Sequence, residues 1–365
     1  MWRLLLYILF LYSSITVVSQ EINLEKLLKS IKDPVFEKIL SNPDRYKVQI
    51  IYSRPTAKGF KDYYYRVNED VYFYPASLAK LPLCVLTYHK LNELNKRNLS
   101  IECQIVTSGP FAPASKYLVA DSTYKFLSLK DHIIRSMVVS DNYSPNYLYE
   151  FLGHGYIQKK LKQLGYNHIK IQQRFATSDT LQHKITYPLK LVSQQGDTVY
   201  QQPLDTSMIK NLPKKEVLLG RRYVDAKGRM VYKPMDFGNE NSISLTQLHQ
   251  MWKEVCYPQI PSKLNLSLKQ KEELKKIASM LPNQCEYPNY YHFADNYRKF
   301  LFYGDINMGI PTPIKIANKV GLAYGFISDV AYFKDQITGI EFSISAVLYV
   351  NDNETLNDGK YEYNS

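Results

Sequence analysis

The chain has 365 residues and a formal net charge of +12, from 46 Lys and Arg against 34 Asp and Glu. With 45% hydrophobic and 22% charged residues, it can build a sizeable core, which excludes a disordered chain and favours one large domain or two intimate ones. The basic residues are spread as short pairs such as Lys159-Lys160. The sequence has no long basic block, which argues against a nucleic-acid partner and favours a solvated basic surface.

Residues 1–19 have the composition of a secretory signal peptide. Arg3 precedes an apolar run over 4–12, and small residues follow. Val17 and Ser19 suit the two small-residue positions before a cleavage site, so we expect cleavage after Ser19 and export. An uncleaved membrane anchor is the alternative, but the run is short for a full span. We therefore expect a mature protein without a stable membrane anchor.

The first half of the mature chain predicts strands followed by helices. An amphipathic helix is expected at 24–42 with an interruption at Pro34, and Tyr- and Val-rich runs with near alternation predict strands at 46–52 and 63–74. Pro75 then opens a helix that extends to about residue 94. Ser128 can cap the next helix in a capping box with Asp131. Further helical sequence covers 147–164, with a break at Gly153.

The second half returns to strands. Turn residues within 187–237 predict two hairpins, at Gly196-Asp197 and Lys227-Gly228. The order of elements predicts an α+β fold, with an antiparallel sheet built from both chain ends, flanking helices and an all-α middle subdomain. Beyond the hairpins, helices are expected at 244–255 and 267–280, and strands at 314–322, 326–333 and 342–350.

The cysteines and histidines do not suggest a metal. The spacing of the four cysteines is unlike that of a zinc site, and the seven histidines form no metal-binding motif. No phosphate-binding glycine motif is present, so we expect no cofactor and no metal. An exported protein can form disulfides, but four buried free thiols fit the sequence at least as well. The cysteines are Cys84, Cys103, Cys256 and Cys285.

Ser77 and Lys80 stand at the start of the helix predicted from Pro75. Residues at i and i+3 share a helix face, so a neutral Lys80 can take the proton of the Ser77 hydroxyl. Burial and nearby cations lower a lysine pKa, and helix N-terminal N–H groups favour an oxyanion. The pattern alone also fits a simple helix cap. Ser207 and Lys210 repeat the same spacing in a turn-rich region.

Two further triplets give this pattern its meaning. Ser140-Asp141-Asn142 ends the apolar stripe of the second helix, and Lys319-Val320-Gly321 ends the first closing strand. Singly, the first is more often a turn and the second a solvated strand. In this order, the three motifs resemble those of the class A β-lactamases and, more broadly, the penicillin-recognising serine hydrolases. The resemblance covers about 24–350, with one large gap.

The resemblance implies a β-lactamase/transpeptidase-like fold and catalytic roles. Ser77 would be the nucleophile, Lys80 its activating base, and Ser140 would pass a proton to the leaving nitrogen. The backbone N–H groups of Ser77 and Leu322 would form the oxyanion hole, a type of donor typically worth about 10²–10³ in rate. A single catalytic domain over 20–365 is expected.

The resemblance also implies how substrate is bound. Asn142 would orient the substrate amide and hold the base, Lys319 would attract a substrate carboxylate, and Gly321 would let its strand lie close to the ligand. We expect a monomer that acts on a small β-lactam or peptide-like substrate in the periplasm or outside a bacterial cell. Within its domain, residues 76–186 would form the mainly helical subdomain and 187–237 a hairpin-rich insertion that lines one edge of the cleft.

The sequence departs from the family at four places. Val320 replaces a threonine whose hydroxyl binds the substrate carboxylate. The loop glutamate that activates the deacylating water is absent: Ser178 stands in its place, Asp179 is the one nearby carboxylate, and no Glu occurs between Phe151 and Lys215. The insertion at 187–237 has no counterpart in the compact enzymes. The family's closing helix is also missing after Val350, as in a sequence shortened at that end.

Three hypotheses arise from these motifs. The leading one is an exported serine hydrolase of the class A β-lactamase type. The second is a penicillin-binding-protein-like carboxypeptidase or transpeptidase that acts on cell-wall peptides, which the missing glutamate favours. The third is a binding module that kept the cleft without turnover, and the complete set of site residues argues against it.

Overall fold

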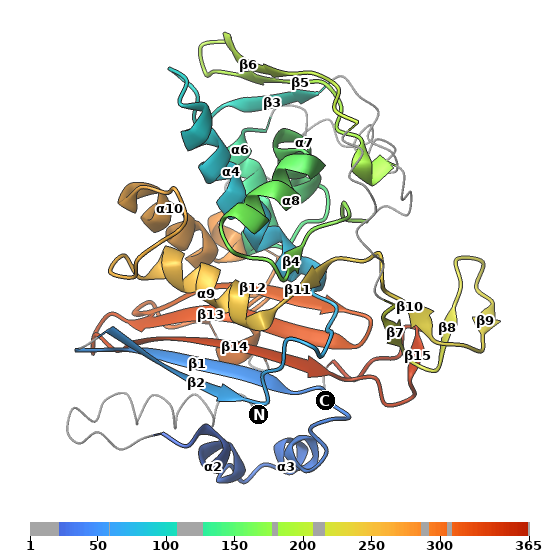
Figure 1. Cartoon of the computed structure of the whole chain (residues 1–365). Helices are drawn as coiled ribbons and strands as arrows, with labels where there is room; N and C mark the ends of the chain where they lie inside the picture. Colours follow the sequence, from blue (N-terminus) through green and yellow to red (C-terminus); the bar gives the residue numbers. More distant parts are fainter. Residues whose placement is uncertain are drawn as a thin grey trace.

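A five-stranded antiparallel sheet forms the centre of the computed structural model, with the strand order β12-β13-β14-β1-β2 (Figure 1). The model describes residues 22–57, 59–107, 127–176, 182–206, 216–285, 292–304 and 309–363. The predicted signal peptide and the Ser207–Lys210 repeat lie outside these residues. The strands are β1 (Gln49–Thr56), β2 (Gly59–Tyr65), β12 (Ile314–Ala323), β13 (Phe326–Asp335) and β14 (Glu341–Tyr349).

Both ends of the chain meet in this sheet, as predicted. β1 pairs with β14 in antiparallel register, with Gln49 opposite Val347 and Ser53 opposite Ser343. β12 is the edge strand and forms a continuous ladder with β13. The last residues of β12 therefore lie at one end of an edge strand, where other elements can approach them.

Two short helices cover one face of the sheet, where a single interrupted helix was expected. They are α2 (Leu24–Lys29) and α3 (Pro34–Ser41). The Asp33 side chain accepts a hydrogen bond from the Phe36 N–H at 2.9 Å, and Pro34 takes the first helical position. Because proline lacks an N–H and is tolerated in a first turn, Pro34 starts a new helix instead of bending the first one. The short helix α11 (Phe300–Tyr303) also contacts this sheet.

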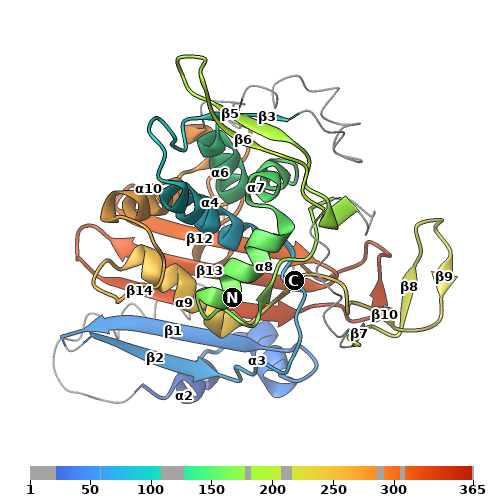
Figure 2. The same cartoon turned by 45° about the horizontal axis from the view of Figure 1, so that its top comes forward.

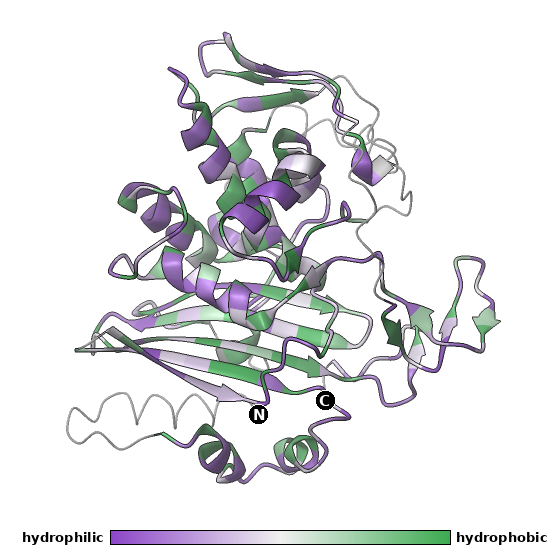
Figure 3. Cartoon of the chain, viewed as in Figure 1, coloured by the Kyte–Doolittle hydropathy of each residue, from purple (hydrophilic) through white to green (hydrophobic). Residues whose placement is uncertain are grey.

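The opposite face of the sheet carries the larger helical part. α9 (Leu245–Cys256) and α10 (Leu268–Ser279) lie on the sheet, and α4 (Lys80–Leu94) lies beyond them, enclosed by other helices (Figure 1). The outer helices α8 and α10 are drawn largely in purple in Figure 3, as expected for solvated faces. The enclosing helices are α6 (Leu129–Val138), α7 (Ser144–Leu152) and α8 (His154–Gln163).

The local signals for these helices hold. The predicted capping box forms, because the Ser128 hydroxyl accepts from the Asp131 N–H at 3.1 Å and the Asp131 carboxylate accepts from the Ser128 N–H at 2.9 Å. Gly153 separates α7 from α8 with φ +80°, a conformation that residues other than glycine rarely adopt.

No helix in the described residues is long and apolar enough to cross a membrane. All four cysteines are buried free thiols.

The strand predicted at 63–74 is too long. β2 ends at Tyr65, and Arg66 has φ +52°, which turns the backbone out of the sheet. The Asn68 side chain then accepts a hydrogen bond from the Asp70 N–H at 2.9 Å. Such a local side-chain to backbone bond competes with strand pairing, so 66–74 runs as an irregular connection towards Ser77.

The segment 187–237 holds both predicted hairpins, but it is tied to the rest of the molecule. β5 pairs with β3 as well as β6, and β8 pairs with β15 near the C-terminus. The β3-β5-β6 sheet lies on the helical part at the top of both views (Figure 1 and Figure 2). The elements are β3 (Gln104–Thr107), β5 (Leu189–Val192), β6 (Thr198–Gln202), β7 (Leu218–Leu219), β8 (Arg222–Val224), β9 (Met230–Val231), β10 (Met235–Asp236) and β15 (Thr355–Leu356).

Apolar side chains of this segment enter the main core. Leu191 is 0% exposed and Phe237 is 1% exposed, and both belong to the cluster that contains α4. An appended flap would leave such residues accessible. The remaining short elements are β4 (Ile169–Lys170), which pairs with β11 (Ser242–Ile243), and the 3₁₀ turns η3 (Gln182–Lys184) and η4 (Pro282–Gln284).

Leu191→Ala should lower the free energy of unfolding by about 2–5 kcal/mol, the usual cost of truncating a buried leucine. Leu218→Ala, in the same segment but 50% exposed, should change it by no more than about 0.5 kcal/mol. Urea unfolding of both variants measures the difference. Equal stability of the two variants would mean that the segment lies outside the cooperative core.

Candidate functional site

Ser77 lies in a short 3₁₀ turn, η1 (Ala76–Ala79), that leads directly into α4. An α-helix was expected from Pro75. Pro82 explains the difference, because it has no N–H to donate to the Leu78 carbonyl, and an α-helical ladder cannot extend back through this position. Ser77 is partly exposed, and its hydroxyl makes no hydrogen bond to the part of the chain that the structure describes.

Lys80 begins α4 with its side chain fully buried and surrounded by oxygen acceptors. Its Nζ donates to the Ser140 carbonyl at 2.6 Å, to Ser140 Oγ at 3.2 Å and to Asn142 Oδ1 at 2.7 Å. The ring of Phe175 lies 5.1 Å from the same Nζ, a distance that favours a cation–π contact. One turn after Ser77, the ammonium is thus fixed by three acceptors and an aromatic face.

Ser140 presents two oxygens to Lys80 because its backbone is left-handed, with φ +60°. This conformation is unusual for serine and requires support from neighbouring residues. Asp141 supplies it: its carboxylate accepts hydrogen bonds from the N–H groups of Tyr143 at 3.2 Å and Ser144 at 2.9 Å, at the start of α7. The middle residue of the Ser-Asp-Asn triplet therefore holds the turn, while its two neighbours face Lys80.

Lys319 reaches the same hydroxyl from the sheet. Its Nζ donates to Ser140 Oγ at 2.9 Å, and its side chain is 1% exposed. Ser140 Oγ therefore joins two buried lysines, one from α4 and one from β12. Three segments that are distant in the sequence meet at this oxygen.

Burial controls the charges of both lysines. Desolvation lowers the pKa of Lys80 to about 7, the nearby Asp141 carboxylate opposes that shift, and the Arg298 guanidinium adds to it. Desolvation also holds the pKa of Lys319 well below its usual value, with the positive charges of Lys80 and Arg298 contributing. A lysine that loses its proton near neutral pH can act as a general base.

Gly321 lets β12 lie directly against the turn that carries Ser77. A Cβ at this position would come within 2.4 Å of the Pro75 carbonyl oxygen and 2.7 Å of Ser328 Oγ. The first of these is backbone and cannot move aside easily, so a larger residue would push β12 away from η1. Leu322 follows in β12, partly exposed, and brings its backbone to the same end of the sheet.

Two site residues escaped the sequence analysis. Arg298 lies close enough to shift the pKa of both lysines, and its guanidinium stacks on Tyr297 at 4.1 Å and donates to its hydroxyl at 2.9 Å. The buried Arg298 Nε has no hydrogen-bond partner among the described residues. No motif marks this loop, so only the folded chain places the residue. Phe175 was visible only as part of the loop that lacks the family's glutamate.

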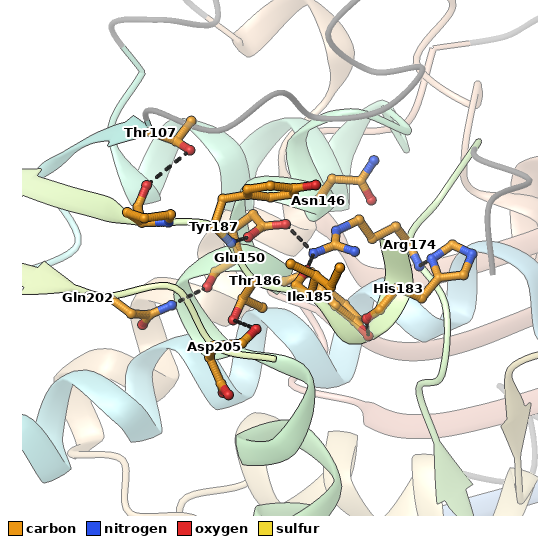
Figure 4. Close-up of polar contacts among 12 residues, drawn as sticks. Thr107, Asn146, Glu150, Arg174, His183, Ile185, Thr186, Tyr187, Gln202 and Asp205 are labelled. Atoms are coloured by element: carbon orange, nitrogen blue, oxygen red, sulfur yellow. Dashed lines mark hydrogen bonds and ion pairs between the residues drawn. The ribbon is translucent and has the colours of Figure 1, made fainter. Parts of the chain in front are cut away.

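A buried ion pair anchors the loop that carries Phe175. Arg174 donates to the carboxylate of Glu150 on α7, and the other Glu150 oxygen accepts from the Tyr187 N–H at 2.8 Å (Figure 4). Gln202 donates to the Glu150 carbonyl at 2.8 Å, which links α7 to β6. Both carboxylate oxygens of Glu150 are therefore occupied. Ser178 and Asp179, the positions discussed for a deacylating base, lie outside the described residues.

Within the described ranges, no group of three or more His, Cys, Asp or Glu could hold a metal ion. The site instead combines a serine, two buried lysines, a second serine and an asparagine amide. Such a set suits covalent chemistry by a serine nucleophile, with proton transfer through lysine and hydroxyl groups.

Comparisons with known proteins identify the family of the chain. The model of the β-lactamase enzyme family matches residues 38–354. Among solved structures, the TLA-3 extended-spectrum β-lactamase matches with a TM-score of 0.50 and 14% identity, over 88% of this chain and 90% of that chain. Because the sequence identity is low, this match supports the fold alone. A search of curated proteins gives no match.

Two other solved structures are similar at the same level. A β-lactamase from Desulfarculus baarsii matches with a TM-score of 0.49 and 13% identity over 87% of each chain. Carbapenemase VCC-1 from Vibrio cholerae matches with a TM-score of 0.48 and 14% identity, over 84% of this chain and 86% of that chain. Because the family model covers most of its length, the chain belongs to the β-lactamase enzyme family and is a β-lactamase-like serine hydrolase.

Proposed function

We propose that this enzyme opens β-lactam or closely related amide bonds through an acyl-enzyme on Ser77. The observation that carries the proposal is Ser140 Oγ, which lies 3.2 Å from Lys80 Nζ and 2.9 Å from Lys319 Nζ. This contact would provide a proton path from Lys80, one helical turn after Ser77, to the place where a leaving nitrogen would sit. We also propose that residues 1–19 direct the enzyme out of the cytoplasm.

Every proton that is transferred during acylation can come from, and return to, this set of residues. Neutral Lys80 takes the proton of Ser77 Oγ, which attacks the carbonyl carbon and forms a tetrahedral oxyanion. The backbone N–H groups of Ser77 and Leu322 donate to that oxyanion. As the carbon–nitrogen bond breaks, Ser140 gives its proton to the nitrogen and receives one from protonated Lys80. Lys80 ends the step neutral, and no external acid is required.

A substrate carboxylate would provide a counter-ion for Lys319. Burial disfavours the charged form of Lys319, and an anion beside it would restore that form. Asn142 holds Lys80 and would also orient the substrate amide. Val320 cannot donate the hydroxyl hydrogen bond of the family's threonine, so recognition of the carboxylate would depend more on Lys319 and on the neighbouring Arg298.

The second candidate function is a penicillin-binding-protein-like carboxypeptidase or transpeptidase. The loop sequence between 151 and 215 contains no glutamate, and the Glu150 carboxylate just before it is held by Arg174 and the Tyr187 N–H. The glutamate that activates the deacylating water in the family therefore has no counterpart in this sequence, and Glu150 is already engaged in other contacts. The two candidates share acylation and differ in the fate of the acyl-enzyme.

Incubation with a fluorescent penicillin should label the wild-type protein at Ser77. The change to test is Ser77→Ala, which removes the attacking oxygen and should abolish labelling. Peptide mapping of the adduct locates the modified residue. Ser207→Ala is the matched control, because Ser207 has the same spacing to a lysine, and it should label normally. An adduct on Ser207, or full labelling of Ser77→Ala, would contradict the proposal.

The acylation rate should rise with pH and level off above about pH 8. Lys80 acts as a base only when neutral, so the reactive fraction falls about tenfold for each pH unit below its pKa of about 7. Stopped-flow labelling between pH 5 and 9 measures the profile. Lys80→Arg keeps a positive charge that is not lost in this range, and it should label slowly at every pH. A flat wild-type profile from pH 5 to 8 would exclude Lys80 as the base.

Deacylation should be slow, with a burst followed by low steady turnover. General-base assistance is typically worth about 10²–10⁴ in rate, and the residue that supplies it in the family is replaced by Ser178. Intact mass measured against time gives the lifetime of the adduct, and Ser178→Glu should shorten it. Fast multiple turnover of a chromogenic cephalosporin that persists in Asp179→Asn would show that another base activates the water.

A further inference from the structure

Tyr324 holds a backbone conformation that its side chain disfavours. It occupies the two-residue loop between β12 and β13 with φ +52°, followed by Gly325 with φ +83°. Ala323 and Phe326 close this loop as the last pair of the ladder. Hairpins with positive φ at both loop positions prefer Asn or Gly at the first, because a bulky residue is strained there. Contacts of the tyrosine ring must therefore stabilise this conformation.

These contacts form an aromatic cluster of Tyr74, Phe237 and Tyr324. The Tyr324 ring meets Tyr74 edge-to-face, with centroids 4.9 Å apart, and meets Phe237 in the same way at 5.0 Å. Tyr74 and Phe237 also contact each other at 5.5 Å. Edge-to-face pairs at such distances are favourable beyond the area they bury. Each ring of the cluster therefore touches the other two.

The cluster connects the two segments that carry the proposed oxyanion donors. Tyr74 stands three residues before Ser77, and Tyr324 stands two residues after Leu322. Phe237 follows β10, in the small sheet beside the end of the five-stranded sheet (Figure 1 and Figure 2). The two donor segments thus share one set of ring contacts, to which the insertion contributes the fully buried member.

We propose that the aromatic cluster sets the spacing of the oxyanion hole, with Tyr324 as its positioning residue. The ring of Tyr324 pulls the end of β12 toward the segment before Ser77, and the strained turn transmits that contact to the Leu322 N–H. Through the ring contacts of Phe237, the segment 187–237 would affect acylation by positioning the donors and not by binding the substrate. This inference rests on the proposed acyl transfer through Ser77. An oxyanion hole depends on donors held at hydrogen-bond distance from the developing charge.

Tyr324→Gly separates this role from simple stabilisation, because it removes the ring and also relieves the backbone strain. The rate constant for acylation at saturating β-lactam should fall at least about tenfold, part of the 10²–10³ that a whole donor is worth. The concentration for half-saturation should change little. Tyr324→Phe keeps the ring and should acylate within about twofold of wild type. Asn98→Gly, at another left-handed position (φ +63°), is the matched control and should not affect the rate.

A spectroscopic readout tests the geometry directly. Weaker hydrogen bonds to the acyl-enzyme carbonyl raise its stretching frequency, so infrared difference spectra should show a higher frequency in Tyr324→Gly and the wild-type value in Tyr324→Phe. Phe237→Leu should also lower the acylation rate and raise the carbonyl frequency, by smaller amounts than Tyr324→Gly. Thermal unfolding confirms that each variant is folded, and Phe237→Leu provides the test if Tyr324→Gly is not.

The outcomes separate the two proposals. A labelled wild type with an unchanged rate and carbonyl frequency in Tyr324→Gly would overturn the positioning role and leave the proposed function intact. A wild type that no β-lactam labels would overturn both. A parallel fall in rate and rise in frequency, rescued by Tyr324→Phe, would support both.

Discussion

The hydroxyl of Ser140 between two buried lysines is the contact on which the site depends. Two ammonium groups on one oxygen repel each other and have lost most of their hydration, which is costly unless each has good acceptors. Lys80 has three acceptors, and Lys319 has the hydroxyl itself. The arrangement persists because burial shifts the pKa of both lysines downward, so at neutral pH the pair need not carry two full charges.

The fold brings these groups together by its topology. Lys80 begins the largely buried helix α4, Ser140 occupies a strained turn held by Asp141, and Lys319 lies on the edge strand. Each position tolerates little change: Pro82 fixes where α4 can begin, and the bare Gly321 fixes how closely β12 approaches. The chemistry is thus supported by backbone constraints outside the reacting groups.

Much of this could be predicted from the sequence, because the relevant signals are local. The capping box at Ser128, the break at Gly153 and the apolar runs of the closing strands each depend on a few adjacent residues. The three motifs then allowed the site residues to be named. Errors arose where the deciding feature was a single backbone angle, as at Arg66, or a missing donor, as at Pro82.

The rest of the site depends on contacts between distant residues. Arg298 and the Tyr74–Phe237–Tyr324 cluster carry no local pattern, and their importance comes only from the groups they meet in the folded chain. The segment 187–237 illustrates the same limit. Its hairpins could be predicted from turn residues, but its pairing with β3 and β15 could not.

The pairing of β1 with β14 has a consequence for how the molecule is made. Gln49 finds its partner Val347 only when nearly the whole chain has been synthesised, and long-range strand pairing is slow to form. Until then, the β1–β2 hairpin has no neighbour on one side, and its apolar face has no sheet to join. A chain of this kind stays open, and exposed to aggregation, until β12, β13 and β14 have paired. The sheet is completed only when β12, β13 and β14 have paired with it, and the same strands bring Lys319 and Gly321 into the site.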